Sequence, residues 1–368
     1  MNLHKLIFIL ASLTVSLSLQ ANQSQQSDLP QESDKETKAI TEEDLKFENR
    51  DLSAYGQGGV PEGIIQLGAG SNYFSPYIFM VDKGARVLSI WEATLNGINR
   101  VSAYTIDIGK NKSDKKILGD KATPEGIYFM LEKYEAAALD YKLYGSRAFT
   151  LDYPNFFDKR ERKTGSGIWI HAVPDTVSLR RGSRGCVVVR DEIIKTLHPY
   201  FKSGFTPVII KDEINMQSRE YAENKRKEIN RLIENWRVSW TTKNLNQYMN
   251  FYHSDFKSLG MNKSRWKNHK KNLNRQYETI TVQLSTPVIY QHKDELVVRF
   301  IQNYSSDQYR DIGEKTLFFK RENGSYKIVG EQWRKDQSRL ALEELTGRST
   351  VSVCKDNSGC GPQSKYSN

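Results

Sequence analysis

The apolar pattern of the chain changes near Met216, and this change sets what the chain can fold into. Before Met216, short apolar runs alternate with polar residues or are continuous over a few positions, which is typical of β-strands. After it, apolar side chains recur at helical spacing inside a strongly charged segment, at Ile229, Leu232, Ile233, Trp236 and Trp240. The chain has 368 residues, which is enough for two domains, and we expect the boundary between them at this point.

The first domain, from residue 61 to residue 213, is predicted to be mostly β. Apolar runs at 77–81 and 85–91 flank Asp82-Lys83-Gly84, a turn signal, so the pattern predicts a β-hairpin. Further strands are expected at 101–108, 127–129 and 207–210, and a helix at 191–201. The pattern favours a β domain with one short helix near its end.

The second domain, from residue 216 to residue 340, is predicted to be α+β. The first helix is followed by helices at 244–252 and 264–277, and strand-like runs then follow at 279–284, 287–291, 295–304, 311–320 and 326–332. Helices first and antiparallel strands afterwards favour a curved sheet wrapped around helices.

The two ends of the chain have other compositions. Residues 1–21 combine a short basic start with an apolar run and resemble a secretory signal peptide, a retained membrane anchor being the alternative. No cysteine follows that run, which argues against a lipoprotein anchor. Residues 22–60 predict a flexible acidic linker, with a short helix near 41–49 as the alternative, and residues 341–368 predict a flexible tail. We therefore expect an exported protein with no membrane span once the signal peptide is removed.

The chain has three cysteines, and export makes their pairing informative. Cys354 and Cys360 lie close together in the polar tail and would close a small loop, unless the tail is disordered and its thiols are incidental. Cys186 is then left over, and an odd thiol in an exported protein is a candidate reactive group.

Charge and motifs narrow the classes of partner. The 54 basic and 44 acidic residues give a net charge of +10, which favours anionic polymers or a membrane surface. We find no nucleic-acid-binding motif, and the six histidines show no zinc-ligand spacing, so we expect no nucleic acid partner, no metal and no cofactor.

A candidate catalytic pair stands inside the β domain. Cys186 lies fifteen positions after His171. The apolar run at 167–172 contains His171, the run at 187–189 follows Cys186, and both are typical of short buried strands. Adjacent strand ends would hold the imidazole against the sulfur, and a thiol needs such a base to become a nucleophilic thiolate. The alternative is a buried structural cysteine.

These residues also carry a resemblance to a known family. His171 followed by Ser183-Arg184-Gly185-Cys186-Val187 resembles the signature of the L,D-transpeptidase (YkuD-type) catalytic domain, and Thr123-Pro124-Glu125-Gly126-Ile127-Tyr128 resembles an upstream strand of that family. The resemblance covers about residues 75–212 and implies a YkuD-type β-sandwich. In the second domain, the helices at 236–256 and the strand residues at 300–306 and 309–311 resemble the NTF2-like cone fold. A transpeptidase-type domain followed by an NTF2-like domain resembles a proteobacterial branch that includes cell-shape enzymes that trim peptidoglycan stem peptides.

The resemblance implies roles for individual residues. Cys186 would be the nucleophile, His171 its base, and the carbonyl of Ala172 would orient the imidazole. Donors or substrate contacts are expected from Ser183, Arg184, Gly185, Trp169 and Arg190, with a purely structural role open for Ser183, Arg184 and Trp169. The sequence departs from the family at Ala172, where many members have Gly, and at Val188, where many have Arg; here the arginine is Arg190.

The implied reaction is cleavage between meso-diaminopimelate and the terminal D-Ala of a tetrapeptide stem through a thioester. Water as acceptor gives a tripeptide, and an amine as acceptor gives a 3–3 crosslink. The domain architecture favours trimming by water in the periplasm. A peptidoglycan-binding scaffold without activity is the non-enzymatic alternative.

Overall fold

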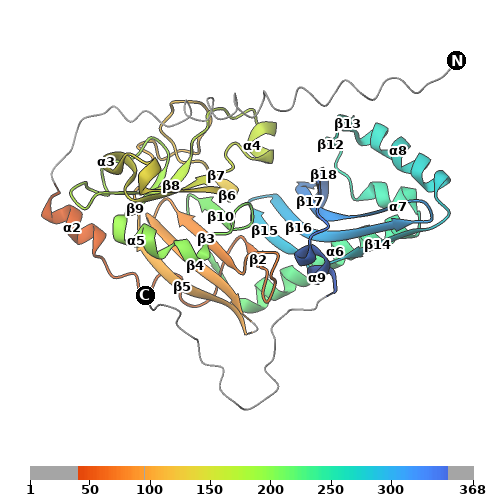
Figure 1. Ribbon diagram of the computed structural model, residues 1–368, viewed down its shortest axis with the longest axis horizontal. Coiled ribbons are helices and arrows are strands. Elements are labelled where there is room, and N and C mark those ends of the chain that lie inside the picture. Colours follow the sequence, from red (N-terminus) through yellow and green to blue (C-terminus); the bar gives the residue numbers. More distant parts are fainter. Residues whose placement is uncertain (1–39, 95, 347–368) are drawn as a thin grey trace, which may run out of the picture.

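The structure is a computed structural model that describes residues 40–94 and 96–346. These residues form two large β-sheets that lie side by side, each with its own helices, and two small sheets of two strands (Figure 1). The first sheet has eight strands in the order β5-β4-β3-β10-β6-β7-β8-β9. The second has six, in the order β18-β17-β16-β15-β2 with β14 paired to β16. The expected combination of a mostly β domain and an α+β domain is confirmed.

The first sheet holds the candidate catalytic residues. Its strands are β3 (Tyr77–Asp82), β4 (Val87–Thr94), β5 (Gly97–Thr105), β6 (Gly126–Glu135), β7 (Arg147–Leu151), β8 (Trp169–Val173), β9 (Val187–Arg190) and β10 (Pro207–Lys211). The predicted hairpin is confirmed, because β3 and β4 pair in antiparallel register from Tyr77 opposite Glu92 to Asp82 opposite Val87. The pairs β3–β10 and β8–β9 are parallel.

The first sheet curls back on itself. Asp107, just after β5, forms an antiparallel bridge with Val188 of β9, although β5 and β9 stand at opposite ends of the strand order. The buried core inside the curl is made mainly of β-branched and aromatic side chains, which suit a pleated surface: Phe79, Val81, Leu88, Ile90, Tyr128, Phe149, Ile170, Val187, Val189, Val208 and Ile210.

Short helices lie between these strands. They are α3 (Tyr141–Tyr144), α4 (Phe156–Arg160) and α5 (Asp191–Thr196), with 3₁₀ turns η2 (Ala136–Ala138) and η3 (His198–Tyr200). The helix predicted over 191–201 is therefore split into α5 and η3. Pro199 explains the break, because proline has no N–H for the next helical hydrogen bond and disfavours helical geometry in the residue before it.

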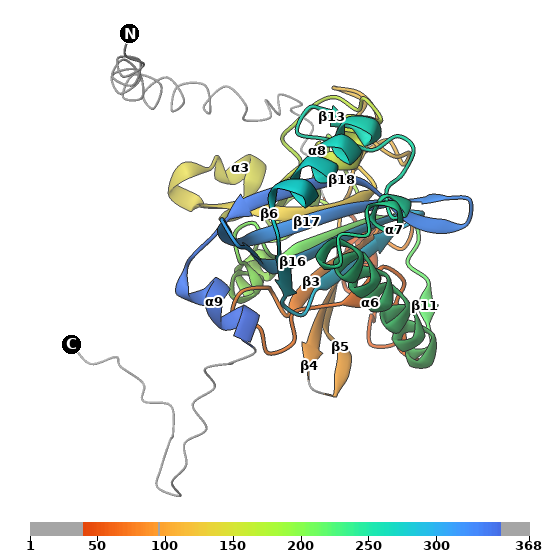
Figure 2. The same cartoon turned by 90° about the vertical axis from the view of Figure 1, so that its right-hand side faces the viewer.

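The second sheet is covered by helices, as expected. Its helices are α6 (Arg219–Thr241), α7 (Leu245–Asn250) and α8 (Lys263–Gln276). Its strands are β14 (Ile280–Leu284), β15 (Val288–His292), β16 (Glu295–Ser306), β17 (Arg310–Glu322) and β18 (Ser325–Lys335), with a small hairpin β12 (Lys257–Ser258) and β13 (Met261–Asn262) and a last helix α9 (Arg339–Thr346). The predicted apolar face of α6 packs onto this sheet through Ile229, Ile233, Trp236 and Trp240. In Figure 2, α6 and α8 lie in front of the strands of this sheet.

The two sheets are interlocked through the chain segment that precedes the first one. β2 (Ile64–Gln66) pairs with β15 and so belongs to the second sheet, and β1 (Val60–Pro61) pairs with β11 (Met216–Gln217). The predicted boundaries at residues 61 and 213 stay a prediction. The strand pairing shows that the chain enters the second sheet before it builds the first.

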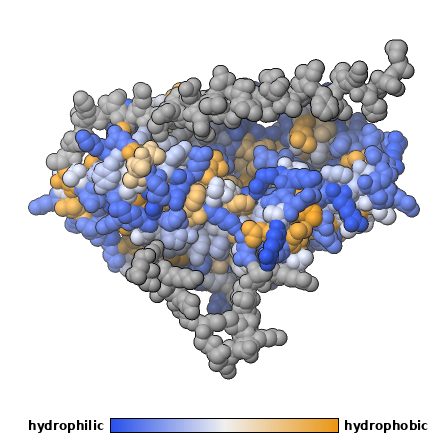
Figure 3. All heavy atoms as spheres, in the orientation of Figure 1, coloured by the Kyte–Doolittle hydropathy of each residue, from blue (hydrophilic) through white to orange (hydrophobic). Residues whose placement is uncertain are grey.

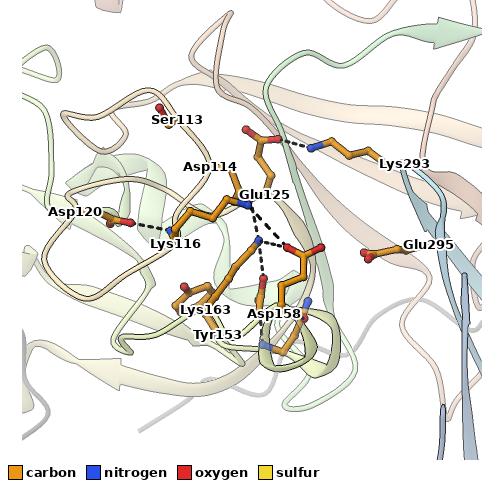
Figure 4. Close-up of polar contacts among 12 residues, drawn as sticks. Ser113, Asp114, Lys116, Asp120, Glu125, Tyr153, Asp158, Lys163, Lys293 and Glu295 are labelled. Carbon is orange, nitrogen blue, oxygen red and sulfur yellow. Dashed lines mark hydrogen bonds and ion pairs between the residues drawn. The ribbon is translucent and has the colours of Figure 1, made fainter. Parts of the chain in front are cut away.

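A cluster of ion pairs lies where the two domains meet, and one of its pairs, Glu125 with Lys293, crosses between them (Figure 4). The carboxylate of Glu125 lies 2.9 Å from Lys83 Nζ within the first domain and 3.0 Å from Lys293 Nζ at the turn between β15 and β16. Nearby, Lys163 Nζ lies 2.9 Å from both Asp114 and Asp158. Pairing these charges keeps the cost of burying them low.

The surface fits the strongly charged sequence. The face in Figure 3 is mainly hydrophilic, with apolar side chains in scattered patches. Among residues 40–94 and 96–346 no helix combines the length and the apolar character needed to cross a bilayer. The predicted signal peptide (1–21), the linker up to residue 39 and the pair Cys354 and Cys360 lie outside the described residues.

Candidate active site

Cys186 and His171 lie on neighbouring parallel strands. Cys186 immediately precedes β9, and His171 is the third residue of β8. The register places Ile170 opposite Val187 and His171 opposite Val188. Because side chains alternate along a strand, Cys186 and His171 point to the same side of strands that are about 4.8 Å apart. Both side chains are buried, with exposed fractions of 6% and 1%.

The imidazole of His171 is held in one orientation. Its Nδ1 lies 2.8 Å from the carbonyl oxygen of Ala172, so Nδ1 carries the proton and donates it to that oxygen. The ring of Tyr144 meets the imidazole edge-on at 5.2 Å between centroids. The other nitrogen, Nε2, is then unprotonated and is the atom that can accept a proton.

Burial sets the charge of this imidazole. It lowers the pKa of His171 to about 4; the hydrogen bond to Ala172 raises the pKa in part, and the charge of Arg181 lowers it further. At neutral pH the resting site therefore contains a neutral imidazole, which is the form that a general base requires.

The thiol of Cys186 has a backbone contact of its own. Its sulfur lies 3.5 Å from the carbonyl oxygen of Gly167, in the segment that leads into β8. Trp169 stands opposite in an apolar cluster with Cys186, stacked on Tyr134 at 5.4 Å and tilted against Tyr144 at 5.3 Å. Trp169 thus forms an aromatic wall beside the sulfur, with only 6% of its surface exposed.

The loop before Cys186 is tied at both ends. Ser183 N donates to Ile108 O at 2.8 Å, and Lys110 N donates to Ser183 O at 2.9 Å. The hydroxyl of Ser183 donates to Cys186 O at 2.6 Å and accepts from Gly185 N at 3.0 Å. Ser183 is therefore a structural residue of this loop, and the Gly185 amide is already engaged. The backbone amides of Arg184 and Cys186 lie on either side of it and are candidate donors to a substrate carbonyl oxygen.

Gly185 is required by its backbone. Its φ of +127° lies in a region that other residues rarely adopt, and a Cβ there would stand 2.7 Å from the carbonyl oxygen of Ala122. Thr123 follows Ala122 and accepts from Gly109 N at 2.8 Å. Residues 122 and 123, in the segment that resembles an upstream strand of the family, therefore pack against the loop that ends at Cys186.

Arg190 lies away from the sulfur. It is four residues beyond Cys186, or about 13 Å along an extended strand. Its guanidinium binds the carboxylate of Glu48 and donates to the carbonyl oxygens of Pro174 (3.1 Å) and Val177 (2.6 Å). These contacts favour an anchoring role over the predicted contact with substrate.

The site also contains residues that the sequence did not single out. Tyr134 and Tyr144 build the aromatic wall, and Gly167 supplies the carbonyl near the thiol. The aromatic positions carried no distinguishing signal, since tyrosines are frequent along the whole chain. Glycine beside the strand that holds the base was the one available hint.

Two family models match the chain. The model of the L,D-transpeptidase catalytic domain matches residues 76–210, and that of the Cds6 C-terminal NTF2-like domain matches residues 228–332. The two matched ranges coincide with most of the two sheets described above. A search of curated proteins found no match.

Three solved structures resemble the whole arrangement of both sheets. Bd1075 of Bdellovibrio bacteriovorus is 43% identical, with a TM-score of 0.70, over 76% of this chain and 100% of its own. The helical cell shape determining protein Pgp2 of Campylobacter jejuni is 26% identical, with a TM-score of 0.59, over 73% of this chain and 95% of its own. A mutant of the same Campylobacter protein is 25% identical, with a TM-score of 0.60, over 74% and 94%.

Proposed function

Because the chain belongs to the L,D-transpeptidase (YkuD-type) family and carries a C-terminal NTF2-like domain, we propose that it cleaves D-Ala from peptidoglycan tetrapeptide stems by cysteine catalysis. One observation carries the proposal. Cys186 and His171 share one side of two adjacent parallel strands, and the imidazole is fixed by its hydrogen bond to Ala172 O. This arrangement supplies a nucleophile and a correctly oriented base.

The first half of the reaction forms a thioester. His171 Nε2 takes the thiol proton, and the sulfur of Cys186 attacks the carbonyl carbon that joins meso-diaminopimelate to D-Ala. Negative charge develops on the carbonyl oxygen, and the amides of Arg184 and Cys186 are the candidates to stabilise it; one such donor is worth ~10²–10³-fold in rate. When the carbon–nitrogen bond breaks, the imidazolium returns its proton to the amine of D-Ala.

The second half of the reaction releases the stem. His171, neutral again, accepts a proton from water as the water oxygen attacks the thioester carbon. The carbon–sulfur bond breaks, the thiol regains a proton, and a tripeptide stem leaves. At neutral pH the ring of His171 is uncharged, so its Nε2 is free of a proton at the start of each half of the reaction.

An amine acceptor is the main alternative. If the amine of a neighbouring stem attacks the thioester instead of water, the product is a 3–3 crosslink. We favour water because the chain resembles Pgp2 of Campylobacter jejuni, a helical cell shape determining protein, over both sheets. A scaffold that binds peptidoglycan without turnover is the non-enzymatic alternative, and the buried Cys186 and His171 pair argues against it.

The location and the substrate charge are consistent with this proposal. The signal-like residues 1–21 would deliver the protein to the periplasm, where peptidoglycan lies. Stem peptides carry several carboxylates, and a net charge of +10 favours their approach.

The test is the release of D-Ala from purified tetrapeptide muropeptides, followed by mass spectrometry of the products. Wild type should give tripeptides, and Cys186→Ala should lose at least ~10³-fold of the rate while its circular dichroism spectrum is retained. Crosslinked dimers as the main product would favour the amine acceptor. D-Ala release unchanged in Cys186→Ala would exclude cysteine catalysis, and binding of sacculi without any release by wild type would favour the scaffold.

A further inference from the structure

A short N-terminal helix is docked beside the nucleophile loop. Residues 42–48, inside the segment expected to be a linker, form α2 (Glu42–Glu48), which is the helix considered as the alternative. Thr41 and Asp44 form a capping box, with Thr41 Oγ1 accepting from Asp44 N and Asp44 accepting from Thr41 N. The capping box stabilises a helix that is too short to persist alone in water. Its persistence therefore depends on what it packs against.

The last residue of α2 holds two parts of the catalytic domain together. Glu48 Oε1 accepts from Leu179 N at 3.0 Å, and Glu48 Oε2 binds the guanidinium of Arg190 through two nitrogens. Both side chains are largely buried, with exposed fractions of 8% and 12%. A buried pair of this kind is costly to break, because the remaining charge is left without compensation.

Arg190 also binds the start of the loop that runs from residue 174 to Cys186. Its third nitrogen donates to the carbonyl oxygens of Pro174 and Val177. Residues 174, 177 and 179 are therefore fixed around one buried ion pair. The loop that they begin ends at Cys186.

Further contacts of α2 fix the middle of the loop. Arg180 forms an ion pair with Glu43 at 2.7 Å and lies over the ring of Phe47 at 5.8 Å. Arg86 lies over the same ring at 5.3 Å and donates to Leu179 O at 3.1 Å. The exposed pair with Glu43 contributes little by itself. Together with the buried Glu48–Arg190 pair, these contacts restrain the part of the loop that precedes Ser183.

We propose that Glu48 and Arg190 are positioning residues: by docking α2 against the catalytic domain, they fix the positions of the Arg184–Cys186 backbone and of the thiol. The proposal rests on the proposed cysteine chemistry, because it assigns these residues to the geometry of that site. A displacement of about 1 Å at a catalytic group, caused from a distance, can cost ~10²-fold in rate. Arg190 lies too far along β9 to touch the scissile bond, so its effect on the reaction passes through the loop.

The test compares Glu48→Gln with Glu42→Gln in the full mature chain. Both variants remove one negative charge from α2, but Glu42 is exposed at the opposite end of the helix. Two quantities are measured: kcat and KM for D-Ala release, and the rate at which iodoacetamide alkylates Cys186 from pH 6 to pH 10. Alkylation reports the thiol without depending on the peptidoglycan reaction.

Glu48→Gln should lower kcat by ~10- to 100-fold with KM within about two-fold of wild type, and should shift the pH profile of alkylation. Glu42→Gln should match wild type in both. Glu48→Asp, which keeps the charge, should recover part of the rate. If Glu48→Gln does not fold, Glu48→Asp replaces it and should still change the alkylation rate by a few-fold, because the shorter side chain cannot hold Leu179 N and Arg190 in the same places.

The outcomes separate this proposal from the proposed function. Equal kcat and equal alkylation profiles for Glu48→Gln and Glu42→Gln would overturn the positioning role and leave the function intact. The same holds if Glu48→Asp has to replace Glu48→Gln and its alkylation profile equals that of wild type. An altered alkylation profile in Glu48→Gln, with no D-Ala release by wild type, would support the positioning role and overturn the proposed function.

Discussion

Acidification should weaken the folded protein, because His171 is buried without charge. Burial holds its pKa at about 4, against an ordinary value of 6.5. Between these two values the unfolded chain binds a proton that the folded chain does not bind. The free energy of unfolding therefore carries no penalty from His171 above pH 6.5, and the penalty grows as the pH falls toward 4.

The size of this penalty follows from the two pKa values. Each pH unit across the window is worth 1.36 kcal/mol, so the full cost is about 3 kcal/mol at pH 4. This is a large part of the 5–15 kcal/mol that stabilises an ordinary domain. His171→Asn removes the titrating group, so between pH 7 and pH 4.5 its unfolding free energy should fall less than that of wild type, by about 2–3 kcal/mol.

The measurement is urea denaturation followed by tryptophan fluorescence at both pH values. His292→Asn offers a companion in the second domain, since burial and then the charges of Lys293 and Lys211 lower the pKa of His292 to about 4. It should flatten the pH dependence in the same way and leave D-Ala release near the wild-type rate. Parallel pH dependences in wild type and His171→Asn would refute the reasoning, because the ring would then be charged or accessible in the folded protein.

Two further predictions test other features. Gly185→Ala places a Cβ 2.7 Å from Ala122 O at a φ of +127°, so it should cost about 1–3 kcal/mol and at least ~10²-fold in D-Ala release. Gly260→Ala, at a φ of +72° with no atom within 4 Å of its Cβ, should lower stability and leave D-Ala release unchanged; equal activity losses in the two variants would contradict this account.

Lys270 lies 3.9 Å from the ring of Trp240, and burial is the main cause that lowers its pKa to about 7. Stability should thus rise by about 2 kcal/mol from pH 7 to pH 9 in wild type and not in Lys270→Met, as measured by urea denaturation; an equal rise in both would exclude Lys270 as the source.

Local patterns predicted most of the elements. The hairpin of β3 and β4 follows from two apolar runs around Asp82-Lys83-Gly84, and α6 follows from apolar residues at helical spacing. Both signals lie within a few residues of each other, so the chain alone determines them. Pro199 shows the limit, because one proline divides a helix whose apolar spacing continues through it.

Contacts between distant residues were not predictable in this way. Glu48 and Arg190 are 142 positions apart, and no periodicity connects them. The composition of residues 22–60 indicated a linker, but the packing of Glu48 and Phe47 against the catalytic domain decides that α2 is ordered. The role predicted for Arg190 came from the family resemblance, in which many members have an arginine two residues after the cysteine. Strand geometry places Arg190 at the far end of β9.

The candidate site was predictable in part. Cys186 and His171 were identified by a motif whose spacing spans two strands, and their parallel pairing gives that spacing a physical meaning. The engagement of the Gly185 amide by Ser183 could not be read from the motif, because it depends on the turn that the loop makes.

The pairing of β2 with β15 has a consequence for how the protein is made. Residues 64–66 leave the ribosome early, yet their partner strand begins at Val288, more than two hundred residues later. β2 therefore stays without its partner strand until synthesis is nearly finished. A chain that ends near residue 216 would leave β2 unpaired, so we expect the two domains to occur together in one chain rather than as separate modules.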